Sequence, residues 1–307
     1  MSQLDISYIN SLAESYTRTI ADAENRYYGG LKTAVNAVID SGRRIILLAG
    51  PSGAGKTTTS QILRDAFISA GHPCELLPLD DFYRDSDDPD YPRLSDGSNN
   101  LECPEALCLN DVKGVISSVL SSGTAAVPVF DFKTAKRKPE KRSIDLSGGG
   151  VLIIEGLHAL NPLISQGIES EKLFKIFVSV STNINEGDTR LLSGKKIRFM
   201  RRLSRDRLYR ASETEQTLSL WRQVLAAENI YLYPYKETAQ LKFDTFHAFE
   251  PGVLKSFVLP ALAESTDGLA LEIRRALEKI KEIPLSAVPQ SSLIREFVPG
   301  GKYEPEI

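Results

Sequence analysis

Cysteine is scarce in this sequence, which has three among its 307 residues: Cys74, Cys103 and Cys108. Three cysteines are too few for the disulfide framework of a small secreted domain. Cys103 and Cys108 lack the two-residue spacing of a zinc knuckle, and no histidine lies near either of them in the sequence. We therefore expect ordinary reduced thiols, with neither a disulfide scaffold nor a structural zinc site.

Long apolar runs are also absent. The longest, such as Ile45–Ala49, have the length of a strand, whereas a membrane helix needs about 20 apolar residues. The N-terminal residues include acidic groups and no apolar stretch of the kind that a signal peptide needs. We expect a cytoplasmic protein without a membrane partner.

Charge of one sign does not dominate the composition either. The chain has 37 basic and 40 acidic residues, and its net charge of −3 does not favour nucleic acid as a partner. This average hides one basic segment, residues 190–210, which has nine basic residues and a single acidic one, Asp206. Arg198, Arg202 and Arg205 share one face if the segment is a helix. The segment is either a phosphate-facing element or a solvated surface helix, and it lacks the interleaved aromatic residues of a nucleic-acid site.

The sequence does have enough apolar residues for a large core, since 42% are hydrophobic. Short apolar segments alternate with longer helical patterns, which is typical of a parallel sheet with helices on both faces. The expected strands are residues 44–49, 74–79, 151–155 and 173–180, with a short extended piece at 127–132. The expected helices are residues 3–40 with a break at Gly29 and Gly30, then 56–70, 110–121, 190–210, 213–229 and most of 252–283. We therefore predict a three-layer α/β fold with a central, mainly parallel sheet.

A glycine-rich segment follows the first apolar strand. Residues 50–57, GPSGAGKT, match the pattern G-x-x-x-x-G-K-[ST], which would occur by chance in roughly one chain of this length in a hundred. A strand before it and a helix after it form the context in which backbone N–H groups hold the phosphates of ATP. Lys56 is expected to reach the β- and γ-phosphates, and Thr57 to bind Mg²⁺. The residues predicted to bind ATP are Gly50, Ser52, Gly53, Ala54, Gly55, Lys56, Thr57 and Thr58.

Carboxylates end two further expected strands. Asp80 and Asp81 follow the strand at 74–79, and Glu155 ends the strand at 151–155. Because the carboxyl ends of parallel strands meet at one edge of a sheet, these groups are expected beside the phosphate loop. Phosphoryl transfer uses one carboxylate to accept the proton of the acceptor hydroxyl and another to hold Mg²⁺. We assign Asp80 as the candidate base and Glu155 to the Mg²⁺ shell; alternatively, the aspartates only cap a loop.

Six further segments resemble those of uridine kinases, in the uridine kinase/phosphoribulokinase superfamily of P-loop kinases, and they occur in the same order. They are DDFYR at 80–84, NLECPEAL at 100–107, PVFDFKT at 128–134, EG at 155–156, RRLSRD at 201–206 and YPYKETA at 233–239. The resemblance implies a P-loop kinase whose basic segment forms an arginine lid over about residues 187–212. We accordingly divide the chain into an N-terminal helical extension (1–42), a kinase domain (43–284) and a C-terminal tail (285–307).

The resemblance also implies the roles of residues on the acceptor side. Asp80 would be the general base toward the 5′-hydroxyl of a nucleoside. Glu102 would hold the ribose 2′- and 3′-hydroxyls, because a carboxylate can accept two hydrogen bonds. The aromatic residues Tyr83, Phe130 and Phe132 would line the acceptor pocket.

On the donor side, the resemblance implies three catalytic cations, Lys56, Arg202 and Arg205. The two arginines would approach the ATP phosphates from a lid that closes and excludes water. The implied cofactors are ATP and Mg²⁺.

Three positions depart from the pattern of uridine kinases. Phe130 stands where a tyrosine is usual, Ala135 where animal-type uridine-cytidine kinases have a histidine, and Ser212 where they have an arginine. The histidine and the arginine contact the pyrimidine base in those enzymes, so the nucleobase is left open. A kinase of another small alcohol, such as pantothenate or a sugar phosphate, is an alternative, and so is a regulatory nucleotide-binding module without acceptor turnover. The sequence does not decide whether the chain forms a homo-oligomer.

Overall fold

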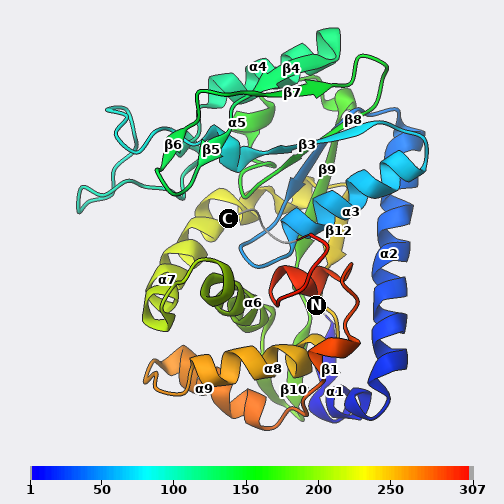
Figure 1. Cartoon of the computed structure of the whole chain (residues 1–307), viewed down its shortest axis with the longest axis vertical. Coiled ribbons are helices and arrows are strands. Elements are labelled where there is room, and N and C mark those ends of the chain that lie inside the picture. Colours follow the sequence, from blue (N-terminus) through cyan, green and yellow to red (C-terminus); the bar gives the residue numbers. More distant parts are fainter. Residues whose placement is uncertain (1, 304–307) are drawn as a thin grey trace.

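The computed structural model describes residues 2–303, and within this range the centre of the molecule is a parallel sheet of five strands (Figure 1). Their order is β12-β9-β2-β8-β3, and every neighbouring pair is parallel. The strands are β2 (Ile45–Ala49), β3 (Cys74–Pro78), β8 (Val151–Glu155), β9 (Leu173–Ser179) and β12 (Leu241–Asp244). The four expected strands are confirmed to within about a residue, and β12 is a fifth that the apolar pattern did not reveal.

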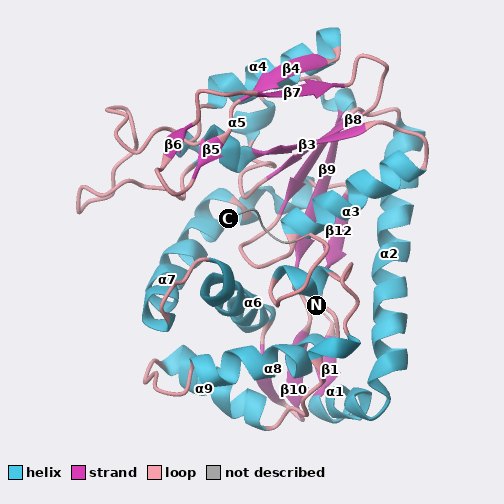
Figure 2. Cartoon of the chain, in the orientation of Figure 1, coloured by secondary structure: helices cyan, strands magenta, loops and turns pink. Residues whose placement is uncertain are grey.

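Helices cover both faces of this sheet (Figure 2). They include α2 (Tyr16–Ser41), α3 (Lys56–Ser69), α4 (Leu109–Ser122), α5 (Pro162–Ser165), α6 (Gly194–Tyr209) and α8 (Glu250–Ala261). Ile46 and Leu48 of β2 pack in one apolar cluster with α2, α3, α6 and α8, whereas Ile45 and Leu47 pack in a second cluster with α4 and α5. This alternation is what a strand buried on both faces requires, and the predicted three-layer α/β fold is confirmed.

Smaller sheets flank the central one. β1 (Gln3–Asp5) pairs with β10 (Asn183–Glu186), which also pairs with β11 (Thr189–Leu192). Elsewhere β4 (Thr124–Val127) pairs with β7 (Arg142–Asp145), and β5 (Phe130–Asp131) pairs with β6 (Lys136–Arg137). The extended piece expected at 127–132 is therefore two short strands. Pro128 lies between them and has no N–H group with which to continue a ladder.

The prediction of a helix from residue 3 with a break at the two glycines is wrong in two respects. Residues Gln3–Asp5 form strand β1, and the helix α1 (Ile6–Leu12) is separated from α2 by a 3₁₀ turn at Ala13–Ser15. Gly29 and Gly30, by contrast, lie inside an uninterrupted α2. Packing on both sides of the glycines, through Tyr27 and Leu31, outweighs their low helix propensity of about 1 kcal/mol each.

The basic segment is only partly helical. Its first residues belong to β11, and α6 begins at Gly194, where the Ser193 side chain caps the helix by accepting from the N–H of Lys196. The next helix, α7 (Thr214–Tyr231), is confirmed close to its predicted position. The helical stretch expected over 252–283 is two helices, α8 and α9 (Gly268–Glu278).

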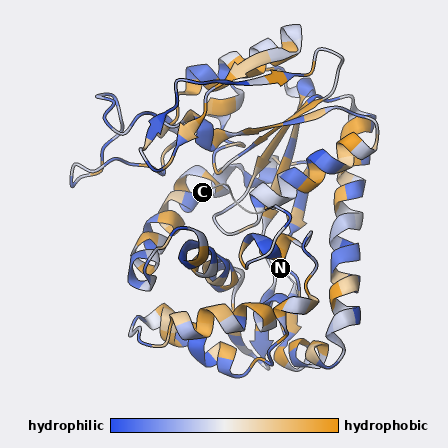
Figure 3. Cartoon of the chain, in the orientation of Figure 1, coloured by the Kyte–Doolittle hydropathy of each residue, from blue (hydrophilic) through white to orange (hydrophobic). Residues whose placement is uncertain are grey.

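The C-terminal segment, residues 285–303, has no helical periodicity in sequence, yet it is part of the core. It contains 3₁₀ turns at Leu285–Ala287 and Leu293–Glu296, and its apolar side chains Leu293, Ile294, Phe297 and Val298 are fully buried. Figure 3 shows that this segment, which lies beside α3, contains both apolar and polar residues. The predicted domain limits at residues 42/43 and 284/285 stay a prediction. Residue 1 and residues 304–307 lie outside the described part of the chain. Among residues 2–303, no helix combines the length and apolar character needed to cross a membrane.

Candidate active site

The glycine-rich loop joins β2 to α3 and is largely buried. Gly53 and Gly55 have φ angles of +72° and +81°, a region that favours glycine. A Cβ atom on Gly53 would lie 2.6 Å from the backbone oxygen of Arg198, so a larger residue would separate the loop from α6. The loop thus turns tightly between β2 and the start of α3, in the strand–loop–helix context that the motif predicted.

Thr57 and Glu155 come together at the end of this loop. The Thr57 hydroxyl, in the first turn of α3, donates at 3.2 Å to Oε1 of Glu155, the last residue of β8. The pKa of Glu155 is raised to about 7, chiefly by burial; Lys56 lowers it, and Asp80 and Glu296 raise it. A hydroxyl and one carboxylate, with ATP phosphates and waters, suit the coordination of Mg²⁺. These two residues could therefore hold the metal that accompanies ATP.

Asp80 lies just beyond β3, in a 3₁₀ turn over Leu79–Phe82. The Asp80 side chain is exposed at the surface of a site that the surrounding protein largely encloses. Because the protein displaces much of the bulk water there, desolvation raises the pKa of Asp80. The positive charges of Lys56, Arg210 and Arg205 lower the pKa of Asp80 in turn. The carboxylate, the phosphate-loop lysine and the end of α6 therefore face a shared space.

The candidate acceptor residues form an aromatic edge next to Asp80. The ring centroids of Tyr83 and Phe130 are 5.7 Å apart, and those of Phe130 and Phe132 are 5.2 Å apart. The Tyr83 hydroxyl donates to the backbone oxygen of Leu101 at 3.1 Å. Burial raises the pKa of Tyr83, and the nearby charges of Asp80 and Glu102 raise it further. Phe132 is 63% exposed, so this edge is open to an incoming molecule.

Glu102 is partly buried at the end of the long loop, close to the other charged residues of the site. Desolvation raises its pKa, Arg202 and Lys56 lower it, and Asp80 raises it. The backbone N–H of Glu102 is held by the Asn100 side chain at 3.2 Å. The structure therefore brings Glu102 into electrostatic range of both Asp80 and the phosphate loop.

The arginines of α6 divide into two groups. Arg198 and Arg201 are buried in bidentate pairs with Glu228 and Glu250, at 2.7–3.0 Å. They also donate to the phosphate-loop carbonyl oxygens of Ser52, at 2.8 Å, and Gly53, at 3.2 Å.

Arg202 and Arg205 are instead partly exposed and share the carboxylate of Asp206. Arg202 also donates to the Ser52 hydroxyl at 3.0 Å. The three arginines that were expected on one helical face therefore differ in their surroundings. Arg198 is buried and supports the loop, whereas Arg202 and Arg205 border the site.

Two carboxylates that accept hydrogen bonds from the phosphate loop were not predicted from the sequence. Oε1 of Glu228 accepts from the backbone N–H of Ser52 at 2.9 Å, and Oε2 of Glu296 accepts from that of Thr58 at 3.2 Å. These contacts span 176 and 238 residues, and no motif or periodicity in the sequence connects the partners.

Three other residues, His158, Ala135 and Ser212, say less about the chemistry of the site. His158 is buried next to Glu102, its ring packs edge-on against Tyr231, and burial lowers its pKa to about 4. At the divergent positions, Ala135 has φ of +53° in the β5–β6 turn, and the N–H of Ser212 donates to the backbone oxygen of Asp206 at 3.1 Å.

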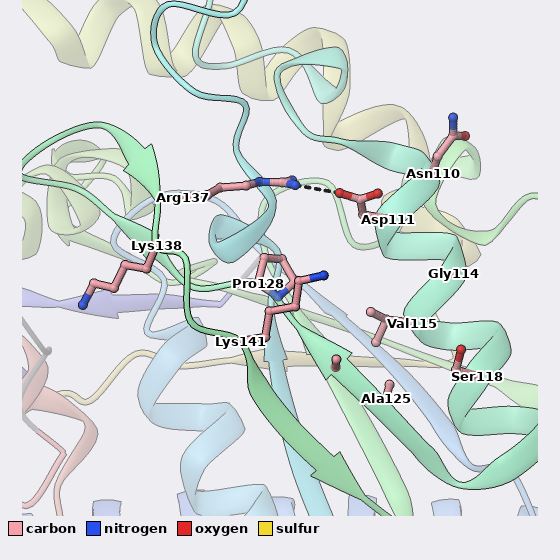
Figure 4. Close-up of a pocket in the computed structure, with 11 residues that line it drawn as sticks. Asn110, Asp111, Gly114, Val115, Ser118, Ala125, Pro128, Arg137, Lys138 and Lys141 are labelled. Atoms are coloured by element: carbon pink, nitrogen blue, oxygen red, sulfur yellow. Dashed lines mark hydrogen bonds and ion pairs between the residues drawn. The ribbon is translucent and has the colours of Figure 1, made fainter.

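A separate pocket of about 450 Å³ lies between α4 and the segment from β4 to β7 (Figure 4). Arg137, one of its lining residues, is paired with Asp111 at 2.6 Å. None of the candidate site residues lines this pocket. The predicted site residues therefore lie outside this hollow.

Comparison with known proteins gives a consistent match. The model of the Phosphoribulokinase / Uridine kinase family matches residues 45–249, which include every candidate site residue. A uridine kinase of Halobacterium salinarum is 26% identical over 168 residues, 55% of this chain and 64% of that protein. A uridine kinase of Latilactobacillus sakei subsp. sakei is 29% identical over 162 residues, 53% of this chain and 66% of that protein. The chain thus spans less than two thirds of the length of these relatives.

Among solved structures, one described as a possible uridine kinase from Bacillus stearothermophilus aligns with a TM-score of 0.49 and 16% identity. The alignment covers 72% of this chain and all of that one.

Proposed function

Because the chain belongs to the Phosphoribulokinase / Uridine kinase family, we propose that it transfers the γ-phosphoryl group of ATP to the 5′-hydroxyl of a nucleoside of the uridine or cytidine type. The observation that carries this proposal is the position of Asp80, whose pKa responds to Lys56 of the phosphate loop and to two arginines at the end of α6. A base, a phosphate-binding loop and nearby cations are the parts that phosphoryl transfer requires. Such an enzyme would act in the cytoplasm, in pyrimidine salvage.

In this mechanism Asp80 accepts the proton of the acceptor hydroxyl. The hydroxyl oxygen forms a bond to the γ-phosphorus, the bond from that phosphorus to the β,γ-bridging oxygen breaks, and ADP leaves. Desolvation makes Asp80 a stronger base, while Lys56, Arg205 and Arg210 favour its ionised form. Both effects serve a carboxylate that must remain charged and yet take a proton.

The phosphates would be held by the N–H groups of the loop and by Lys56. Mg²⁺, bound with ATP by Thr57 and Glu155, would neutralise phosphate charge. Arg202 and Arg205, which pair with Asp206 in this structure, would turn toward the transferring group. Glu102 would accept hydrogen bonds from the ribose hydroxyls, and the edge formed by Tyr83, Phe130 and Phe132 would contact the acceptor.

A phosphorylated sugar alcohol is the second candidate acceptor. Arg202 is the cation that lowers the pKa of Glu102 most. A cation beside the acceptor carboxylate could bind an acceptor phosphate. Ala135 and Ser212 also lack the side chains that contact a pyrimidine base in animal-type enzymes, which weakens the case for strict base recognition.

The test is ADP release from Mg·ATP with a panel of acceptors: uridine, cytidine, purine nucleosides, pantothenate and sugar phosphates. We expect stimulation by at least one pyrimidine nucleoside. Stimulation only by another alcohol would replace the nucleoside in this proposal. ATP binding without stimulation by any acceptor would instead indicate a regulatory module.

A further inference from the structure

The C-terminal segment, residues 285–303, packs against the start of α3, where the phosphate loop ends. In Figure 1 it is the red chain beside α3 and α6. A Cβ atom on Gly55 would lie 2.7 Å from Cδ1 of Leu293, so the segment touches the loop itself. Three residues further on, Glu296 directs its carboxylate at the same helix end.

Glu296 occupies a position that a phosphate-binding helix normally leaves for its ligand. Its Oε2 accepts the backbone N–H of Thr58 at 3.2 Å, in the first turn of α3. The residue that precedes the helix, Gly55, has no side chain with which to cap it. First-turn N–H groups of a phosphate loop hold the α- and β-phosphates, and each N–H has one hydrogen to donate. A carboxylate on that hydrogen therefore stands in the place of an anionic ligand.

The charge of Glu296 makes the contact unfavourable for a bound nucleotide. The side chain is 6% exposed and forms no ion pair with any residue in the range 2–303. It lies close enough to Glu155 to raise the pKa of that carboxyl. ATP would bring several more negative charges into a space that already contains these two carboxyl groups.

The segment is held in place by residues other than Glu296. The Ser204 hydroxyl donates to the backbone oxygen of Phe297 at 2.6 Å, and the guanidinium of Arg201 lies 5.1 Å from the centroid of the Phe297 ring. The Tyr28 hydroxyl donates to the backbone oxygen of Ser291 at 2.7 Å. A change at Glu296 alone should thus leave the segment docked.

We propose that the C-terminal segment is an internal competitor of the nucleotide, in which Glu296 holds the Thr58 N–H until a phosphate of ATP displaces it. The inference rests on the proposed function in one respect, namely that the phosphate loop binds ATP. It adds a regulatory contact: any event that keeps Glu296 on the loop lowers affinity for the nucleotide, and any event that withdraws it raises that affinity.

The test compares Glu296→Gln and Glu296→Ala with the wild type and with Glu282→Gln. Glu282 is exposed and contacts Ser256, so its change matches the loss of charge away from the loop. Calorimetric titration with Mg·ATP should give a Kd about tenfold lower for both Glu296 variants, equivalent to ~1.4 kcal/mol. The Glu282 variant should bind as the wild type does. Unfolding temperatures measured in parallel would show whether a variant is still folded.

An equal or weaker affinity in folded Glu296→Gln and Glu296→Ala would overturn the inference and make Glu296 a capping residue that supports the loop. If neither the wild type nor the variants bind ATP, the proposed function itself fails. If all bind equally, only the competitor role fails.

Discussion

The two halves of the candidate site are built in opposite ways. The donor half is the phosphate loop, which lies in the core and is braced by the buried arginine–glutamate pairs of Arg198 and Arg201. The acceptor half consists of a long loop and a two-stranded hairpin, and its outermost ring, Phe132, is 63% exposed. The core therefore fixes the shape that receives the phosphates, whereas surface side chains determine which acceptor fits. Phosphate binding should tolerate changes in the acceptor half, and acceptor binding should be easily altered.

Asp80→Asn gives the largest expected effect, because Asp80 lies where the two halves meet. An amide cannot accept the hydroxyl proton, so we expect kcat to fall about a thousandfold while the Kd for Mg·ATP stays within a factor of about two. Steady-state kinetics and calorimetry on the same preparation measure both values. Near-normal turnover would remove Asp80 from the role of base, and a parallel loss of ATP affinity would show that the halves are not separable.

Arg201→Met tests whether the donor half depends on its buried pairs. The substitution leaves Glu250 fully buried without its cation and removes a donor to Gly53, so the free energy of unfolding should fall by about 3 kcal/mol. Arg207→Met is the matched control, because Arg207 is exposed on the same helix, and its loss should cost less than about 0.5 kcal/mol. Chemical denaturation measures both. Equal losses would mean that the buried pair does not brace the loop.

The same contrast explains what the sequence could predict. The motif at residues 50–57 and the alternation of strands and helices predicted the strand, loop and helix of the donor half, because local pattern and core burial agree there. Helical spacing correctly put Arg198 and Arg202 on one face of α6. Helical spacing could not show that Arg198 pairs with Glu228, thirty residues away, while Arg202 pairs with Asp206 on its own helix.

Contacts between distant segments account for most of the remaining differences. Glu296 contacts Thr58 across 238 residues, and strand β1 pairs with β10, which is far from it in the sequence. The continuity of α2 through Gly29 and Gly30 likewise depends on packing and not on propensity. For the acceptor half, resemblance alone identified the residues, and their roles stay predictions.

Glu155 gives the donor half a dependence on pH. Its pKa is about 7 in the folded protein and near 4.5 when unfolded, so folding takes up a proton between these values. The contribution of Glu155 to stability should thus be most favourable below about pH 4.5 and should decline by as much as ~3 kcal/mol as the pH rises through 7. Glu155→Gln should flatten the unfolding free energy over this interval relative to the wild type, as denaturant titrations at several pH values would measure. Parallel curves would contradict the raised pKa.

Glu102→Gln tests the acceptor half with the smallest expected effect. An amide keeps one acceptor oxygen but loses the charge, so a substrate whose two ribose hydroxyls are held here should show KM raised about tenfold, with kcat and ATP affinity nearly unchanged. Glu105→Gln is the control, since Glu105 is exposed three residues further on. Repeating the measurement with 2′-deoxynucleosides sharpens the test: the variant should discriminate less between ribose and deoxyribose than the wild type does. An unchanged KM for the ribonucleoside would show that Glu102 does not grip the ribose, and a fall in ATP affinity would mean that this carboxylate belongs to the donor half after all.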